Sequence, residues 1–155
     1  MNELYPWMPA LASAPKDPKE RDRVLSRLKQ IAKRYGVPFN PARVKWTYYD
    51  LWKREGPDAF AEPWHMRYPI DRTHIRAALS YFNKPSNRQQ VPPKARLIIL
   101  ERIIRKALSY GIDVAYQEGD PLYARLPESL KKRLKGYKSK QDWKALYGDF
   151  YGGAI

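Results

Sequence analysis

The sequence predicts an all-α protein: a small bundle of about six helices with long proline- and aromatic-rich loops and extended termini. In several segments apolar residues recur with the 3.6-residue period of a buried helical face, and no segment shows the alternation of apolar and polar residues that indicates a β-strand. The chain has 155 residues, of which 43% are hydrophobic and 14% aromatic. This is enough apolar material for a real core, in one domain or in two very small ones.

The clearest helix covers residues 93–110. Pro93 stands in the first turn, where proline is tolerated, and Gly111 follows the end, where a left-handed residue is common. The apolar face is too wide for a surface helix, so we expect this to be the central buried helix of the domain. Its remaining side carries Arg96, Arg102, Arg105 and Lys106.

Residues 18–35 repeat the pattern of residues 93–110 without gaps, at a constant offset of 75. The matching pairs include Pro18 and Pro93, Arg21 and Arg96, Leu25 and Leu100, Arg27 and Arg102, Ala32 and Ala107, Tyr35 and Tyr110, and Gly36 and Gly111. So many matches in register favour an internal helix duplication; the alternative is two unrelated basic helices with similar caps. The first copy has a narrower apolar stripe and more charge, which predicts a position nearer the surface.

The chain is expected to divide into three regions. Residues 1–16 combine three prolines with large apolar side chains. This predicts an extended N-terminal arm that packs either on its own domain or on a neighbouring subunit. Residues 17–137 are expected to form the helical domain with the two related helices. Residues 138–155 are expected to form a C-terminal helix and an aromatic, glycine-containing tail.

The helical domain is expected to begin at Asp17, which caps the first helix in a capping box with Glu20. A further helical run is expected from residue 40 to residue 55, before an ordered proline- and aromatic-rich loop at 56–70. The elements expected after that are a helix at 71–83 capped by Asp71, a polar turn at 84–92, the helix at 93–110, a loop at 112–126, a short helix at 127–136, and a last helix capped by Ser139 with Asp142.

The charge of the chain indicates a polyanionic partner. There are 30 Lys and Arg residues against 16 Asp and Glu, which gives a net charge of +14 and a pI near 10. Such an excess disfavours a compact state by self-repulsion, and a bound polyanion explains it most simply. Nucleic acid is the first candidate and an anionic membrane surface the second. A surface that is merely very soluble is the alternative.

Cysteine usage and hydropathy exclude several classes of protein. The chain has no cysteine, so it has neither a disulfide framework nor a cysteine-based metal site. No stretch approaches the roughly 18 apolar residues of a membrane span. The N-terminal sequence lacks the basic start and continuous apolar run of a signal peptide. We therefore expect a protein that stays in the host cytoplasm or in a particle made there.

An enzyme is not expected, and neither is a cofactor or a bound metal. There is no glycine-rich phosphate loop, no G-x-S-x-G and no H-E-x-x-H motif. The two histidines, His65 and His74, cannot supply a metal site alone. A nuclease would need several carboxylates converging on a magnesium ion. Capping and pairing with arginine explain the acidic residues of this region better: Asp50, Glu55, Asp58, Glu62 and Asp71.

Basic residues recur beside aromatic residues in nearly every segment, which is typical of nucleic-acid binding. Lysine and arginine neutralise phosphates and release counterions without reading bases. Because the charge is spread over several helices, it favours wrapping or packaging over readout by one recognition helix. The candidate nucleic-acid-binding residues are Arg23, Arg27, Lys33, Arg34, Lys45, Lys53, Arg54, Lys131, Lys132, Arg133 and Lys135.

Two resemblances extend this interpretation. Residues 73–112 resemble a short helical module of prokaryotic virus and mobile-element proteins, a module that implies no activity. The match is carried by Ala77, Tyr81, Asn83, Asn87, Pro93, Arg102, Ile103, Ala107, Gly111 and Ile112. The chain as a whole is similar to the α-helical, DNA-wrapping coat proteins of filamentous and rod-shaped archaeal viruses. Leu134, Lys135, Gly136 and Tyr137 echo a run found in some of them.

These observations predict a non-enzymatic structural protein that binds nucleic acid. Its most concrete form is a virion coat or nucleoprotein subunit that wraps double-stranded DNA and assembles through its terminal arms, as a homo- or hetero-oligomer with related subunits. The alternative is a helical accessory or adaptor module of a prokaryotic virus or mobile element that binds a protein partner. The sequence leaves open whether the nucleic acid is DNA or RNA and which basic face contacts it.

Overall fold

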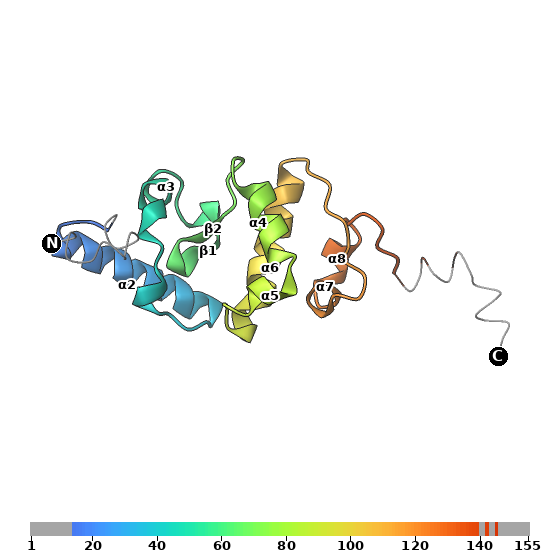
Figure 1. The fold of residues 1–155 in the computed structure, drawn as a ribbon, viewed down its shortest axis with the longest axis horizontal. Helices are drawn as coiled ribbons and strands as arrows, with labels where there is room; N and C mark the ends of the chain where they lie inside the picture. The colour runs from blue at the N-terminus through green and yellow to red at the C-terminus, as the bar shows by residue number, and fades with distance from the viewer. Residues whose placement is uncertain (1–13, 140–141, 143–144, 146–155) are drawn as a thin grey trace.

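The computed structural model describes residues 14–139 together with residues 142 and 145. The prediction of an N-terminal arm therefore falls almost entirely outside the described residues, as does most of the predicted last helix. In the described part the elements follow one another along an elongated body, with α2 (Pro18–Tyr35) near one end and α8 (Glu128–Lys131) near the other (Figure 1).

The described residues contain four longer and three short α-helices, one two-stranded sheet and several 3-10 turns. Besides α2 and α8, the α-helices are α3 (Tyr49–Glu55), α4 (Ile75–Phe82), α5 (Pro85–Arg88), α6 (Pro93–Ser109) and α7 (Pro121–Ala124). The strands are β1 (Phe60–Glu62) and β2 (Arg67–Pro69), and the 3-10 turns are η2 (Pro41–Arg43), η3 (Trp46–Tyr48), η4 (Pro57–Ala59) and η5 (Pro63–His65).

The prediction of a purely all-α fold is wrong, because β1 and β2 pair as an antiparallel hairpin within the predicted loop at 56–70. Phe60 lies opposite Pro69 and Glu62 opposite Arg67. Each strand has only three residues, and all three residues of β1 are buried. So short a strand with both faces covered shows no alternation of apolar and polar residues. The fold is predominantly helical with a small antiparallel sheet.

The two helices of the predicted duplication are confirmed. Helix α2 has the predicted bounds, and α6 ends one residue before the predicted residue 110. Both close with the same cap: Gly36 and Gly111 have φ angles of 68° and 75°, a left-handed conformation that favours glycine. The next backbone N–H donates back to the carbonyl of Ala32 in one helix and Ala107 in the other.

The two related helices differ in depth, as the sequence predicts. Helix α2 buries four side chains and α6 buries six. The equivalent residues Val24 and Ile99, Leu28 and Ile103, and Ala32 and Ala107 are all buried. Helix α6 therefore lies deeper, and α2 keeps a broad exposed side.

Other predicted elements need correction. The helical run at 40–55 is two 3-10 turns followed by α3, because the extended residues Asn40 and Val44 on either side of η2 interrupt it. The expected helix at 71–83 begins only at Ile75. The short helices α5 and α7 occupy the predicted turn at 84–92 and the predicted loop at 112–126. Four-residue helices are too short to produce an apolar period, so sequence periodicity misses them.

Asp17 caps α2, but the predicted capping box does not form. The Asp17 side chain accepts a hydrogen bond from the backbone N–H of Lys19 at 3.0 Å. Glu20 instead accepts a bond from the hydroxyl of Tyr49 at 2.6 Å, which ties α2 to α3. Ser139 and Asp142 do make the predicted reciprocal cap, since the hydroxyl of Ser139 accepts from the Asp142 N–H and the Asp142 carboxylate accepts from the Ser139 N–H.

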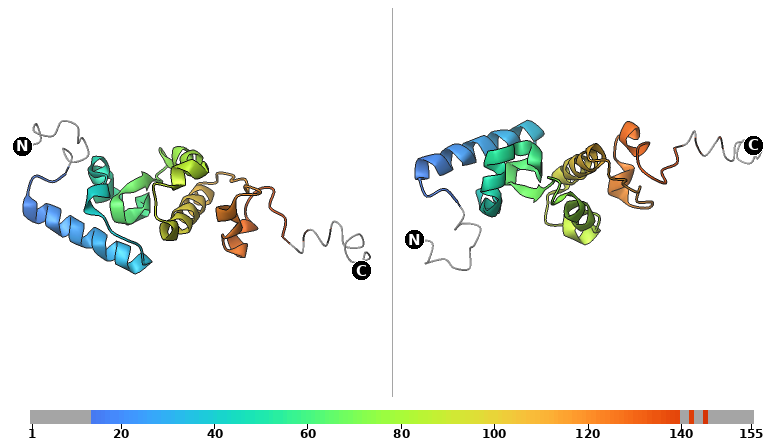
Figure 2. Two further views of the ribbon diagram at one scale, coloured as in Figure 1. Left: turned by 60° about the horizontal axis from the view of Figure 1, so that its bottom comes forward. Right: turned by 90° about the horizontal axis from the view of Figure 1, so that it is seen from above.

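The hairpin packs between the two related helices, η5 against α2 and β1 against α6 (Figure 2). The Trp64 ring lies 5.5 Å from the Tyr35 ring at the end of α2. Arg102 of α6 holds this junction and does not share the exposed side of its helix as expected. Its guanidinium group donates to the carbonyls of Phe60 and Pro57 at 2.8–3.1 Å and to the Tyr35 hydroxyl at 2.9 Å.

A buried ion pair joins the C-terminal part to the helical centre. Arg88 donates to both carboxylate oxygens of Asp120 at 2.8 and 2.7 Å, and its Nε donates to the carbonyl of Phe82. Asp120 also caps α7 through the Leu122 N–H. Burial alone raises the pKa of Asp120, but the hydrogen bonds from Arg88 and Leu122 outweigh it and lower the pKa below its ordinary value of 3.8.

None of the helices in the described ranges combines the length and apolar character needed to cross a membrane.

Replacing Arg102 tests its role at the junction. We expect Arg102→Met to lower the free energy of unfolding by about 2–3 kcal/mol, because the substitution leaves buried carbonyls without a donor. The control Arg105→Met removes an exposed ion pair of the same helix, 3.5 Å from Glu101, and should change stability by less than about 0.5 kcal/mol. Urea unfolding measures both, and equal effects would contradict the junction.

Replacing Asp120 tests the buried ion pair through its pH dependence. The lowered pKa means that the unfolded state binds more protons near pH 3.8, so the stabilisation is present above that pH and is lost as pH falls through the folded-state pKa. Asp120→Asn should therefore be less stable than the wild type at about pH 7, and the difference should shrink toward about pH 2. Asp113→Asn is the control, because the Asp113–Lys135 pair is exposed. A pH-independent difference would contradict the assignment.

Candidate nucleic-acid interface

A stripe of basic residues runs along the exposed side of α2. Arg23, Arg27, Gln30 and Arg34 are spaced by four, three and four residues, so they lie on one helical face over about 16 Å of axis. All four are exposed. Among the described residues, no carboxylate forms an ion pair with the three arginines. We call Arg23, Arg27, Gln30 and Arg34 the α2 stripe.

The α2 stripe borders a hollow of about 460 Å³ between α2 and the segment 57–63. Arg27 and Arg34 line it together with Arg102, and Asp58 is the acidic residue in the lining. Arg102 is only partly exposed, and its recorded partners are carbonyls and a hydroxyl rather than a carboxylate. Three guanidinium groups against one carboxylate leave the hollow positive, and guanidinium geometry suits phosphate oxygens.

Helix α3 lies beside α2 and adds charge to the same end of the molecule. The guanidinium carbon of Arg27 is 5.3 Å from the centroid of the Trp52 ring. Lys53 and Arg54 are exposed, and each has an acidic neighbour on its own helix, Asp50 at 3.4 Å and Glu55 at 4.0 Å. Such exposed pairs are weak, so both side chains are available to a polyanion.

Tyr49 fixes the contact between α2 and α3. Burial, followed by the hydrogen bond to the Glu20 carboxylate, raises the pKa of Tyr49 to about 12. The hydroxyl therefore stays protonated and donates at any ordinary pH. The bond holds α3 against the first turn of α2, next to the α2 stripe.

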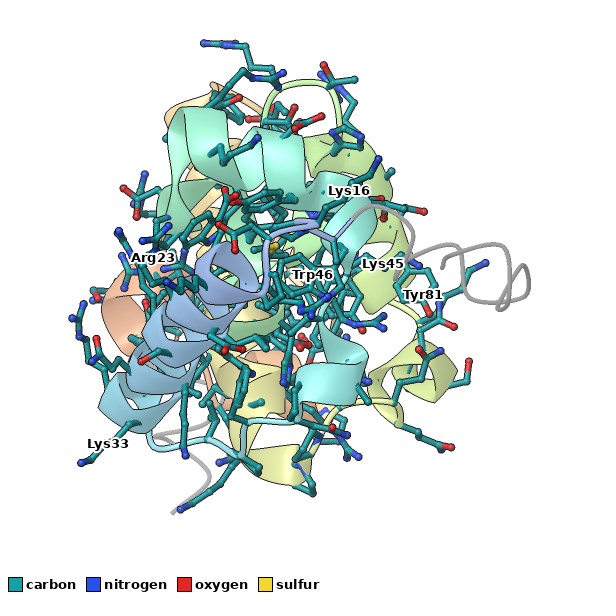
Figure 3. All side chains as sticks on the ribbon, turned by 90° about the vertical axis from the view of Figure 1, so that its left-hand side faces the viewer. Lys16, Arg23, Lys33, Lys45, Trp46 and Tyr81 are labelled. Carbon is teal, nitrogen blue, oxygen red and sulfur yellow. The ribbon has the colours of Figure 1, made fainter. Side chains whose placement is uncertain are left out.

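The remaining predicted residues of the α2 region lie on different flanks of the helix. Figure 3 shows Arg23 and Lys33 projecting outward on one flank of α2, and Lys45 on the other flank, toward Tyr81. Lys33 is exposed, whereas Lys45 is half-buried. Lys45 therefore does not extend the α2 stripe.

The structure does not bring the α8 candidates to the α2 stripe, because α8 lies at the other end of the body (Figure 1). Lys131 is turned inward: its side chain is 14% exposed and donates to the carbonyl of Ala124 at 3.0 Å. Lys135 lies 3.6 Å from Asp113. Lys132 and Arg133 are exposed, and no ion pair within the described ranges involves them. The predicted residues thus form two separate basic ends.

A buried polar network holds the tip of the hairpin. Glu62 and His65 are 1% and 3% exposed, and their side chains are hydrogen-bonded to each other. Arg43 donates to both Glu62 oxygens at 3.2–3.3 Å, and the Asn40 N–H donates to Nε2 of His65 at 2.9 Å. Every ring nitrogen and carboxylate oxygen of this pair is occupied by a protein partner. The network therefore supports the fold and offers no open catalytic group.

The other acidic and histidine side chains are also dispersed. His74 bonds Asp71 at 2.6 Å. Within the described ranges, no three histidine or acidic residues are close enough together to hold a metal ion.

The sequence prediction missed two basic residues with an evident place in the structure. Arg102 lines the hollow beside the α2 stripe, and its match to Arg27 in the repeat was a signal that singled it out. Arg67 lines a different hollow, and the Arg67–Tyr68 pair was a basic residue beside an aromatic one. In both cases the side chain is only partly exposed, a property that a single sequence does not show.

Comparison with known proteins gives one match. Residues 50–117 match the model of a family of unknown function (DUF6582), which is less than half of the chain. The matched segment runs from α3 through the hairpin and α6, and it excludes α2 with its stripe. No curated protein and no solved structure matches the chain. The match includes residues 73–112, but it says nothing about the predicted likeness of this segment to a viral and mobile-element module, and none of these comparisons links the chain to viral coat proteins.

Proposed function

We propose that this chain is a non-enzymatic nucleic-acid-binding protein that holds the phosphate backbone against the α2 stripe. The observation that carries the proposal is the hollow of about 460 Å³ lined by Arg27, Arg34 and Arg102. Arginine side chains that have no carboxylate partner among the described residues are available to phosphate oxygens, and desolvation near the hollow strengthens those contacts.

The geometry supports binding without base readout. The α2 stripe is straight and follows one face of a helix whose other face is buried in the core. Contacts from such a face reach the sugar–phosphate backbone and carry no sequence information. Double-stranded DNA, with its regular and dense phosphate charge, is the favoured partner.

Lys132 and Arg133 at the other end offer a second basic surface. Two separated basic ends on one elongated body suit a protein that contacts more than one stretch of backbone. Assembly as a virion coat or nucleoprotein subunit is the finer form of this proposal. It rests on the sequence resemblance and on the terminal arms, most of which lie outside the described residues.

The salt dependence of DNA binding tests the proposal. Fluorescence anisotropy with a labelled blunt duplex should give a log–log slope of affinity against salt steeper than about −4, with little sequence preference. The double variant Arg27→Gln and Arg34→Gln should make the slope shallower by about 2, since each lost phosphate contact removes about 0.9. The charge-matched control Arg76→Gln and Lys84→Gln removes the same charge from two exposed residues that belong to neither basic end.

Two outcomes would overturn the proposal. One is flat binding between low and moderate salt, or no binding, by a monomeric chain in sedimentation; this is what the adaptor alternative predicts. The other is an equal loss of DNA affinity in both double variants. Net charge alone would then account for the binding, and the α2 stripe would have no special role.

A further inference from the structure

A second hollow, of about 380 Å³, lies between β2 and α4. Its lining combines two basic side chains, Lys45 and Arg67, with the aromatic rings of Tyr48, Tyr68 and Tyr81. The volume falls in the range of small-molecule sites, about 300–1,000 Å³. It is separate from the hollow beside the α2 stripe, and the two share no lining residue.

Arg67 is a partly buried cation at this hollow, and no carboxylate in the described part of the chain forms an ion pair with it. Its Nε donates to the carbonyl of Arg43 at 2.7 Å, and no acceptor among the described residues is recorded for its two Nη atoms. Burial, together with the nearby charge of Arg43, lowers the pKa of Arg67. Glu62, opposite Arg67 in the hairpin, is already bonded to Arg43 and His65. An anion bound at the Nη atoms of Arg67 would offset the free-energy cost of burying this positive charge.

The other charges around the hollow also favour an anion. Lys45 is half-buried, and no carboxylate in the described ranges forms an ion pair with it. His74 lines the hollow too, and its Nδ1 is bonded to Asp71. The hollow therefore has two open cationic groups, and the nearby acids are already engaged.

The backbone on either side of Arg67 is held in an unfavourable conformation. Met66 and Tyr68 have φ angles of 53° and 58°, the left-handed region that side chains other than glycine rarely adopt. Strain of this kind persists only where the surrounding structure imposes it, and it is concentrated at binding and catalytic sites. Here it turns the chain back after η5 and places Arg67 and Tyr68 in the lining of the hollow.

Tyr81 supplies an exposed aromatic face at the hollow. Its side chain is 37% exposed, and its ring centroid lies 5.9 Å from that of Tyr68. The side-chain amide of Gln90 donates to the Tyr81 hydroxyl at 2.8 Å, which limits the freedom of the ring. Nucleobases stack on such rings with little preference for one base.

We propose that this hollow binds one unpaired nucleotide, with its base against the ring of Tyr81 and its phosphate at Lys45 and Arg67. The guanidinium group of Arg67 and the ammonium group of Lys45 match the phosphate of a nucleoside monophosphate. The ring of Tyr81 matches its base. This inference rests on the proposed function and adds to it: the α2 stripe needs only a phosphate backbone, whereas this hollow needs a base that is free of its partner strand. The nucleotide comes from a strand end or from a single-stranded stretch.

The ligand preference of the hollow is tested by titrating the full chain with AMP, adenosine and inorganic phosphate. Changes in the amide NMR shifts report binding of each probe. AMP should bind about tenfold more tightly than adenosine or phosphate, because only AMP engages both halves of the site. The shifts should centre on Arg67 and Tyr81. Equal affinities for the three probes, or shifts centred elsewhere, overturn the inference.

Substitutions then assign the two halves of the site. Lys45→Gln and Arg67→Gln should each weaken AMP binding about tenfold, and Tyr81→Leu should do the same by removing the ring. Tyr81→Phe keeps the ring and should stay within about twofold. Arg76→Gln is the matched control, since Arg76 is exposed on α4 and does not line the hollow. The Lys45 side chain makes no hydrogen bond or ion pair within the described ranges, so Lys45→Gln remains informative even if Arg67→Gln unfolds the chain.

A duplex with a single-stranded overhang separates this inference from the proposed function. It should bind about tenfold more tightly than the blunt duplex, and an abasic overhang should lose that gain. The double variant of Arg27 and Arg34 should weaken blunt and overhanging duplexes alike, whereas Tyr81→Leu should affect only the overhang. Equal binding of both duplexes by the wild type overturns the unpaired-nucleotide site and leaves the α2 stripe intact. Loss of all duplex binding while AMP still binds overturns the proposed function and supports the site.

Discussion

The guanidinium group of Arg102 makes the side-chain hydrogen bond with the greatest sequence separation among the described residues, 67 positions to Tyr35. It reaches from the central helix to the end of α2 through Tyr35 and to the hairpin through the carbonyls of Pro57 and Phe60. Backbone carbonyls solvate the buried part of this cation without neutralising it, because a dipole carries no net charge. The group that fixes the junction therefore also contributes positive potential to the hollow beside the α2 stripe. At this point stability and the proposed phosphate binding depend on the same side chain.

The sequence pattern shared by α2 and α6 serves a different purpose in each helix. In both related helices the positions equivalent to Val24, Leu28 and Ala32 are buried, so each copy presents the same face to the core. The equivalent arginines Arg27 and Arg102 then differ in how deeply they are buried. Arg102, in the deeper copy, is enclosed by the hairpin and becomes a structural donor, whereas Arg27, in the outer copy, lies over Trp52 with its polar end exposed. A basic helix that packs outside a core keeps its arginines for a partner.

The features of the fold that depend on long, local sequence patterns could be predicted from the sequence. Both related helices and their glycine ends follow from periodicity and capping, and Arg27 and Arg34 follow from their place on an exposed face. The hairpin could not be predicted in this way, because its two strands are three residues long and β1 is buried on both faces. The contribution of Arg102 to the hollow depends on that hairpin lying between α2 and α6. Arg67 was missed for a related reason, since left-handed residues on either side of it are a tertiary outcome.

The hairpin also links the two hollows. Pro57 in η4 and Pro63 in η5, the turns that flank β1, line the hollow of the α2 stripe. Arg67, Tyr68 and Pro69 of β2 line the other hollow. A shift of one residue in the pairing of Glu62 with Arg67 would turn every side chain of a strand to the opposite face. The buried network of Glu62, His65 and Arg43 opposes such a shift, because it would leave a buried carboxylate without its partners. This network therefore sets the position of both hollows at once, although none of its three side chains lines either of them.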